Sequence, residues 1–122
     1  MKNTARLTLV LAALVLAVVP LALAADAVKA VGTWDTVATT PNGDTPSVLV
    51  IKQVDGALKA EMELDGAART ITNEKLEGDV FRMTLQYEGG IYDVEVKIAG
   101  DTFEGTWQGG GVSGTLKAKR RP

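Results

Sequence analysis

Turns marked by glycine, at nearly regular spacing, constrain the fold of this chain more than any other feature. From Gly43 to Gly111 a turn glycine, alone or in a run, recurs about every 10 to 13 residues. Five of the turns carry Asp next to Gly, and both residues tolerate the positive φ angles that tight hairpin turns require. Seven such turns divide the chain into eight segments, a spacing typical of short strands joined by hairpins.

Between the turns, apolar and polar residues alternate. Residues 58–64 alternate Leu, Ala, Met and Leu with Lys, Glu and Glu, and the same pattern fills 81–87 and 92–98. An alternation of period two gives a strand one face for a core and one face for water. No stretch after Ala24 has the 3.6-residue period of an amphipathic helix, so we expect no long helix.

We therefore predict an all-β domain, an eight-stranded antiparallel up-and-down β-barrel in which each strand pairs with its neighbour in sequence. Strands with one apolar face bury it either in a closed barrel or in a two-sheet sandwich. The uniformly short connections favour the barrel, because a Greek-key sandwich needs at least one long crossover. The predicted strands are Val31–Thr39, Ser47–Val54, Leu58–Leu64, Arg69–Leu76, Val80–Tyr87, Ile91–Ile98, Thr102–Gln108 and Val112–Arg120.

The fourth predicted strand, 69–76, is the weakest. Its only large apolar side chains are Ile71 and Leu76, and the stretch 73–75 suits a β-bulge or an edge. If the barrel is open anywhere, we expect the opening there. Residues 39–46, which include two prolines, are expected to form the longest polar loop.

The first 24 residues have the pattern of a secretory signal peptide. Lys2 and Arg6 provide a basic start, residues 7–23 are almost wholly apolar, and residues 22–24 read Ala-Leu-Ala, a small-x-small cleavage site. An uncleaved membrane anchor is the alternative, since the 17 residues of the apolar run just reach the lower limit for a span. We favour cleavage because Pro20 interrupts the run just before the cleavage site.

The predicted organisation is a signal peptide (1–24), a short N-terminal segment (25–30) and a single barrel domain (31–122). The protein is expected to be secreted or periplasmic. Contact with a membrane is expected only through the signal peptide, before its cleavage.

The chain contains no His and no Cys, which excludes Ser-His-Asp and Cys-His catalytic groups, thiolate zinc sites and disulfides. Lys, Tyr and the carboxylates remain as acid–base groups, and the alternation turns most strand carboxylates outward. We therefore predict no enzyme activity, no catalytic residue, no metal site and no cofactor. Removal of residues 1–24 takes away two cations, so the net charge of −2 becomes −4, which argues against nucleic acid as a partner.

Motifs at the two ends of the predicted barrel carry a resemblance to a known family. Gly32-Thr33-Trp34 opens the first strand and Arg120 ends the last, which is similar to the lipocalin (calycin) arrangement. The resemblance implies that Trp34 closes one end of the barrel beneath Arg120, with cation–π stacking between them.

The chain also resembles the small lipocalin-like barrel domains of secreted bacterial proteins. Those domains share a G-x-W-D start, a T-P-x-G loop and a G-D-T-x-x-G-T-W finish, which stand here at 32–35, 40–43 and 100–107. The chain departs from true lipocalins in its shorter strands and in having neither a C-terminal helix nor a disulfide.

The interior of an eight-stranded barrel is either filled by side chains or holds one small ligand. Gly105 and Gly114 are expected to let their strands bend and, with Ala38, Ala60 and Ala118, to leave space inside. Tyr87 and Tyr92 flank one turn and point to the same face, so their hydroxyls either bond each other or orient the polar end of a ligand. The residues expected to line a cavity are Met62, Met83, Leu85, Tyr87, Tyr92, Val94, Phe103 and Trp107.

These features predict an exported, non-catalytic binding protein whose barrel holds one small hydrophobic ligand. The alternative is a structural or interaction barrel with a filled core, which contacts a partner protein through its surface or through the fourth strand as an edge. Neither alternative specifies an oligomeric state.

Overall fold

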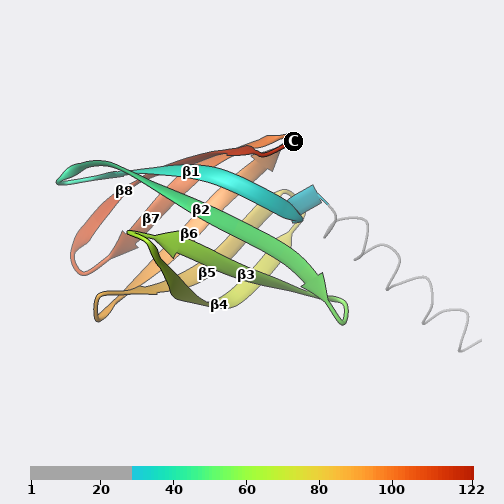
Figure 1. Cartoon of the computed structure of the whole chain (residues 1–122), viewed down its shortest axis with the longest axis horizontal. Helices are drawn as coiled ribbons and strands as arrows, with labels where there is room; N and C mark the ends of the chain where they lie inside the picture. Colours follow the sequence, from blue (N-terminus) through green and yellow to red (C-terminus); the bar gives the residue numbers. More distant parts are fainter. Residues whose placement is uncertain (1–28) are drawn as a thin grey trace, which may run out of the picture.

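The computed structural model of the chain describes residues 29–122 and confirms the predicted barrel (Figure 1). Within these residues eight strands form one closed antiparallel barrel, in which each strand pairs with its sequence neighbour and β8 pairs with β1. The strands are β1 (Gly32–Thr40), β2 (Gly43–Val54), β3 (Ala57–Leu64), β4 (Ala67–Glu77), β5 (Val80–Tyr87), β6 (Gly90–Ala99), β7 (Thr102–Gly109) and β8 (Val112–Arg120).

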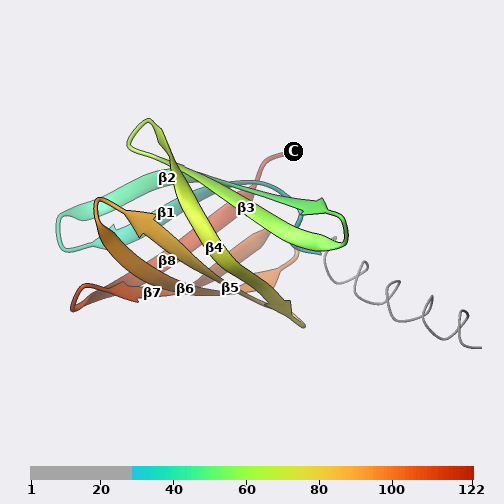
Figure 2. The same ribbon diagram turned by 90° about the horizontal axis from the view of Figure 1, so that it is seen from below.

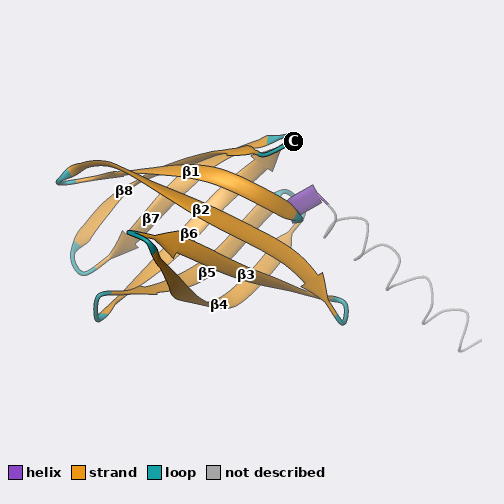
Figure 3. Ribbon diagram, viewed as in Figure 1, coloured by secondary structure: helices purple, strands orange, loops and turns teal. Residues whose placement is uncertain are grey.

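The chain ahead of β1 is described only in part. Lys29 and Ala30 are helical (Figure 3), and the predicted signal peptide at 1–24 lies outside the described residues. No helix in the described part of the chain is long and apolar enough to cross a membrane.

The hairpin turns alternate between the two ends of the barrel. The turns β1–β2, β3–β4, β5–β6 and β7–β8 lie at one end, which we call the open end. The other three turns and the C-terminus lie at the opposite, closed end, together with the helical residues before β1 (Figure 1). Four turns hold two successive residues with positive φ, as type I′ hairpins require: Asp55–Gly56, Asp65–Gly66, Glu88–Gly89 and Gly110–Gly111.

Pairing between the first and the last strand closes the ring. Five residue pairs join β1 to β8, from Trp34 opposite Arg120 to Ala38 opposite Leu116. A closed ring has no free strand edge at this position, so a strand of another chain cannot pair with the sheet there.

The prediction of a long polar loop at 39–46 is wrong. β2 begins at Gly43, so only residues 41–42 form the turn. Pro46 fits within the strand because it pairs with Val37 of β1, while the ladder between β2 and β3 begins one residue later. A strand that is paired on one side only tolerates proline. The other predicted strands differ from the observed ones by at most two residues at either end.

The seam between β3 and β4 has the shortest ladder of the described barrel. Only three residue pairs join the two strands, all next to their shared turn and ending at Met62 opposite Arg69. Beyond that pair the strands diverge (Figure 2). The barrel is nevertheless closed, so the fourth strand marks a weak seam rather than an opening.

A β-bulge in β4 supplies a side chain that crosses this seam. The register between β4 and β5 shifts between Thr72 and Lys75, and Asn73 has a φ of 57°. The irregularity expected at 73–75 is therefore present. It places the Glu74 carboxylate where it accepts a hydrogen bond from the backbone N–H of Ala60 in β3, at 2.9 Å.

Apolar side chains pack most tightly in the half of the barrel near the closed end. The largest fully buried apolar side chains are Trp34, Phe81, Phe103, Leu49, Ile51 and Val96. Thr36 is buried as well, and its hydroxyl hydrogen-bonds that of Ser47 on the neighbouring strand. The alternation places Phe81 and Val96 on the apolar faces of their strands. It did not predict the hydroxyl pair, because Thr and Ser carry no apolar signal.

Gly105 and Gly114 leave no space inside the barrel, contrary to our expectation. A Cβ atom at Gly105 would lie 1.9 Å from the carbonyl oxygen of Glu95, so the backbone of β6 already occupies that position. A Cβ atom at Gly114 would lie 2.1 Å from the carbonyl oxygen of Thr39 and 2.7 Å from Nε1 of Trp107. Both glycines let another part of the wall approach closely, which is a common use of glycine within strands.

Glu74→Ala tests the bridge across the seam. The substitution is expected to lower the free energy of unfolding by about 1–2 kcal/mol, as for the loss of a hydrogen bond to a charged group, and to speed hydrogen exchange at the Ala60 amide. Chemical denaturation and amide exchange followed by NMR measure the two effects. Glu74→Gln keeps an acceptor oxygen and is the matched control, expected to retain most of the protection. Unchanged exchange at Ala60 in Glu74→Ala would contradict the bridge.

Candidate functional site

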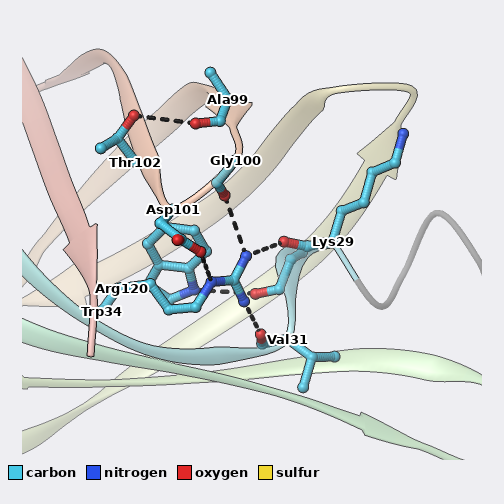
Figure 4. Close-up of polar contacts among 9 residues, drawn as sticks. Lys29, Val31, Trp34, Ala99, Gly100, Asp101, Thr102 and Arg120 are labelled. Carbon is cyan, nitrogen blue, oxygen red and sulfur yellow. Dashed lines mark hydrogen bonds and ion pairs between the residues drawn. The ribbon is translucent and has the colours of Figure 1, made fainter. Parts of the chain in front are cut away.

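The closed end of the barrel is built around Trp34. Its indole is fully buried, its Nε1–H donates a hydrogen bond to the carbonyl oxygen of Ala30 at 3.0 Å, and its ring centroid lies 4.9 Å from that of Phe103. The guanidinium of Arg120 stacks on the indole, 4.3 Å from the ring centroid (Figure 4). The two residues predicted for barrel closure are therefore in direct contact.

Arg120 also fastens the segment before β1 to the turn between β6 and β7. Its guanidinium donates hydrogen bonds to the carbonyl oxygens of Lys29 (2.6 Å), Val31 and Gly100 (3.3 Å). Its Nε–H bonds the carboxylate of Asp101 at 3.2 Å (Figure 4). One side chain thus ties together three parts of the chain that are distant in sequence.

Gly32, the first residue of the G-x-W motif, makes room for this arrangement. A Cβ atom at Gly32 would lie 2.9 Å from Nη1 of Arg120, and the φ of Gly32 is 148°. Side chains rarely tolerate that backbone conformation, whereas glycine adopts it readily. The motif therefore combines the buried ring with the gap through which the arginine reaches it.

The open end of the barrel holds a cavity of about 520 Å³. Ligand-binding sites commonly measure about 300–1,000 Å³, so the cavity is large enough for a small molecule. None of the six fully buried apolar side chains of the packed half lines it. Its wall includes Met62, Leu64, Leu85, Val94, Trp107 and Leu116, and its rim includes Thr40, Thr45, Ser47, Asp65, Tyr87 and Glu88.

Tyr92 and Trp107 form the aromatic part of the wall. Their ring centroids lie 5.8 Å apart at 72°, an edge-to-face contact. The Nε1–H of Trp107 donates a hydrogen bond to the carbonyl oxygen of Thr39 at 3.1 Å. Because that bond satisfies the only polar atom of the indole, Trp107 contributes apolar ring surface to the cavity.

Tyr87 links the rim to the turn between β3 and β4. Its hydroxyl donates a hydrogen bond to the carboxylate of Asp65, and the guanidinium of Arg69 lies over its ring at 4.7 Å. The bond to Asp65, then desolvation, then the negative charges of Asp65 and Glu88 raise the pKa of Tyr87 to about 12. The Tyr87 hydroxyl, which we expected either to bond Tyr92 or to orient a ligand, therefore has Asp65 as its partner.

Six of the eight predicted cavity residues line this cavity: Met62, Leu85, Tyr87, Tyr92, Val94 and Trp107. Met83 and Phe103 are each 2% exposed and do not line it. Of the small inward residues, Ala38 lines the cavity, whereas Ala60 and Ala118 are buried elsewhere.

Among the cavity residues that sequence reasoning missed, two kinds are instructive. Leu64 and Leu116 line the wall, and the alternation together with the nearest turn would have placed them there. Asp65 and Glu88 line the rim from positive-φ turn positions, where no strand periodicity shows the direction of a side chain.

A second hollow, of about 580 Å³, follows the seam between β3 and β4. Exposed charged residues such as Lys52, Lys59 and Glu61 line it, together with Val50 and Ile71. This mixed lining differs from the mainly apolar wall at the open end and suits a small apolar molecule less well. Residues 29–122 contain no cluster of three or more His, Cys, Asp and Glu side chains that could hold a metal ion.

Comparison with known proteins supports the barrel fold of this chain but indicates no activity. No protein-family model matches the chain, and no curated protein matches it. Among solved structures, the chain is similar to a redesigned β-barrel, with a TM-score of 0.62 over 80% of this chain and 96% of that one. The two sequences are 15% identical, so the likeness concerns the barrel fold alone.

Substitutions at the closed end test what holds the ring together. Trp34→Ala is expected to lower the free energy of unfolding by about 3–5 kcal/mol. Arg120→Lys keeps the charge but loses the stacked, multiply bonded guanidinium, and is expected to cost about 1–2 kcal/mol. Chemical denaturation of both variants measures these losses.

Arg121→Lys is the matched control for Arg120→Lys. Arg121 is exposed and bonds the exposed carboxylate of Asp35 at 2.8 Å, a bond that holds the pKa of Asp35 below its usual value. Surface ion pairs of this kind contribute about 1 kcal/mol or less, so Arg121→Lys is expected to change stability little. Equal losses at positions 120 and 121 would show that Arg120 does not hold the closed end.

Proposed function

We propose that the protein is an exported, non-catalytic binding protein that holds one small hydrophobic ligand in the open end of its barrel. The observation that carries the proposal is the uneven filling of the interior. Large aromatic and branched side chains fill the half near Trp34, while about 520 Å³ near the opposite end is bordered by Met62, Leu85, Val94 and Leu116. Transfer of an apolar molecule from water to such a wall is favourable at about 25 cal/mol per Å² of buried apolar surface.

The chemical character of the cavity lining supports binding rather than catalysis. The wall offers apolar carbon and sulfur atoms, and methionine side chains such as Met62 adapt to irregular ligands. A few polar residues, among them Thr45, Asp65 and Glu88, also line the cavity, and such groups orient a ligand without surrounding it. A chain with neither His nor Cys has few groups suited to general acid–base or nucleophilic chemistry.

Kinship with lipocalin-like barrels also forms part of this proposal. It is supported by the G-x-W motif, whose glycine makes room for Arg120 and whose tryptophan lies beneath it. Export is supported by the basic start, apolar stretch and Ala-Leu-Ala site of residues 1–24.

Export predicts a defined mature protein. The intact mass of the protein recovered outside the cytoplasm of its host is expected to correspond to residues 25–122, because cleavage should follow Ala24. Mass spectrometry of the same material under native conditions shows any ligand that leaves the cell with it. An intact mass that includes residues 1–24 would contradict cleavage and favour an anchor.

A second function, a barrel that binds a partner protein, is favoured by the seam between β3 and β4. The ladder stops at Met62 opposite Arg69, so the backbone of β3 before Met62 is held in part by a side chain, Glu74. A partner's strand is the kind of occupant that such a weakly paired segment accepts. The hollow of about 580 Å³ along the seam lies beside that segment.

Ala38→Phe tests ligand binding at the open end. Ala38 is half-buried and lines the cavity, so a phenyl group there takes up the space of a ligand. Binding of N-phenyl-1-naphthylamine, a neutral dye whose emission rises in apolar surroundings, is expected to weaken about tenfold or more, because a filled cavity buries far less of the dye. A fluorescence titration measures the dissociation constant.

Ala99→Phe is the matched control, since Ala99 is exposed and lies at the closed end, beside the turn from β6 to β7. It is expected to bind the dye as the unmodified protein does. Thermal unfolding of both variants checks that the barrel is intact. No dye binding by the unmodified protein would sink the proposed ligand site and leave the partner-binding barrel as the better hypothesis.

A further inference from the structure

The charged side chains that line the cavity at the open end are both acidic. Asp65 and Glu88 lie at its rim, in the turns β3–β4 and β5–β6, and the rest of the lining is uncharged. An anionic ligand group placed at this rim would meet two exposed carboxylates, which repel it most at low ionic strength. A cationic group would meet two partners of opposite charge.

Arg69, a cation beside the rim residue Tyr87, is already engaged. Arg69 donates a hydrogen bond from Nε to the carbonyl oxygen of Leu64 at 3.1 Å and stacks over the ring of Tyr87 at 4.7 Å. It lines a separate outer hollow with Tyr87 and Glu88 rather than the cavity. Because Arg69 does not line the cavity, it places no positive charge against a ligand inside it.

Aromatic rings lie among the same lining residues. Tyr87, Tyr92 and Trp107 all border the cavity, and the indole N–H of Trp107 is already bonded to Thr39. A ring attracts a cation through the negative charge of its π face. The stacking of Arg69 on Tyr87 shows that a ring of this rim already accepts a cationic group.

Together these observations specify the ligand more closely. We infer that the open end of the barrel binds an apolar molecule carrying one ammonium group, with the apolar body against Met62, Leu85 and Leu116 and the ammonium at the rim near Asp65 and Glu88. The inference rests on the proposed function and adds the chemical class of the ligand. It excludes long-chain carboxylates, whose head group would face the same two acids.

Three probes with one apolar body test the inference: 1-naphthylmethylammonium, 1-naphthalenemethanol and 1-naphthaleneacetate. They carry an ammonium, a hydroxyl and a carboxylate on the same naphthalene. Isothermal titration calorimetry at low ionic strength is expected to show the ammonium probe binding about tenfold tighter than the alcohol, and the carboxylate binding most weakly. Added salt should narrow these differences, since screening weakens exposed charges.

The double variant Asp65→Asn with Glu88→Gln locates the preference. Asn keeps an acceptor oxygen for the Tyr87 hydroxyl, so the rim retains its hydrogen bond while both charges are removed. The ratio of ammonium to alcohol affinity is expected to fall severalfold, to the smaller preference that the aromatic rings alone provide. The control is Glu61→Gln with Glu104→Gln, which removes two exposed carboxylates outside the cavity and is expected to leave the ratio unchanged.

The outcomes separate the two proposals. If the alcohol or the carboxylate binds as tightly as the ammonium, or if the ammonium preference is undiminished in the double variant, the inferred ligand class is wrong and the apolar binding site stands. If none of the three probes binds, the proposed function fails and the inference fails with it. Thermal unfolding of each variant confirms that the differences arise in a folded barrel.

Discussion

Contact between Trp34 and Arg120 is the interaction on which the rest of the structure depends. Each strand has one apolar face, and all of these faces are buried only if β1 pairs with β8. The five pairs that join these strands start at Trp34 opposite Arg120. From the same position Arg120 bonds the segment before β1 and the turn after β6. The same two side chains thus lie at one end of the ladder that closes the ring and seal that end of the barrel.

Because the closed end is tightly packed, the fold does not need a tightly packed core at the open end. A chain without disulfides depends on its core for stability, and the largest fully buried apolar side chains, among them Trp34, Phe81 and Phe103, all belong to the packed half. Each contributes about 1.5–3 kcal/mol of burial energy or more. With that burial concentrated near the closed end, a cavity of about 520 Å³ at the open end is compatible with a stable fold. The packed half supports the fold, and the open half is available for a ligand.

The sequence predicted the strands well because their two signals are local. Period-two alternation and turn glycines act over a few residues, and both appear in the structure as expected. The segment 43–46 misled us because its prolines and polar residues usually mark loops, whereas pairing with β1 alone lets Pro46 stay in a strand. The Tyr87–Asp65 bond and the β6 backbone beside Gly105 were not predictable, since each depends on how distant segments meet. Whether an eight-stranded barrel is filled or hollow depends on the same three-dimensional packing.

The weak seam and the cavity share strand β3 without conflict, because they use different parts of it. The three pairs between β3 and β4 lie next to their turn at the open end, so the wall carrying Met62 and Leu64 is hydrogen-bonded where it borders the cavity. The strands diverge only farther along, beside the packed half, where Glu74 bonds Ala60. Local opening of the seam would therefore expose core residues before it disturbed the cavity wall. A ligand that fills the cavity contacts Met62 and Leu64 and should stabilise the paired part of β3, while a partner's strand would add to the diverging part. The two proposed functions thus make different amides of the same strand sensitive to binding, which hydrogen exchange can distinguish.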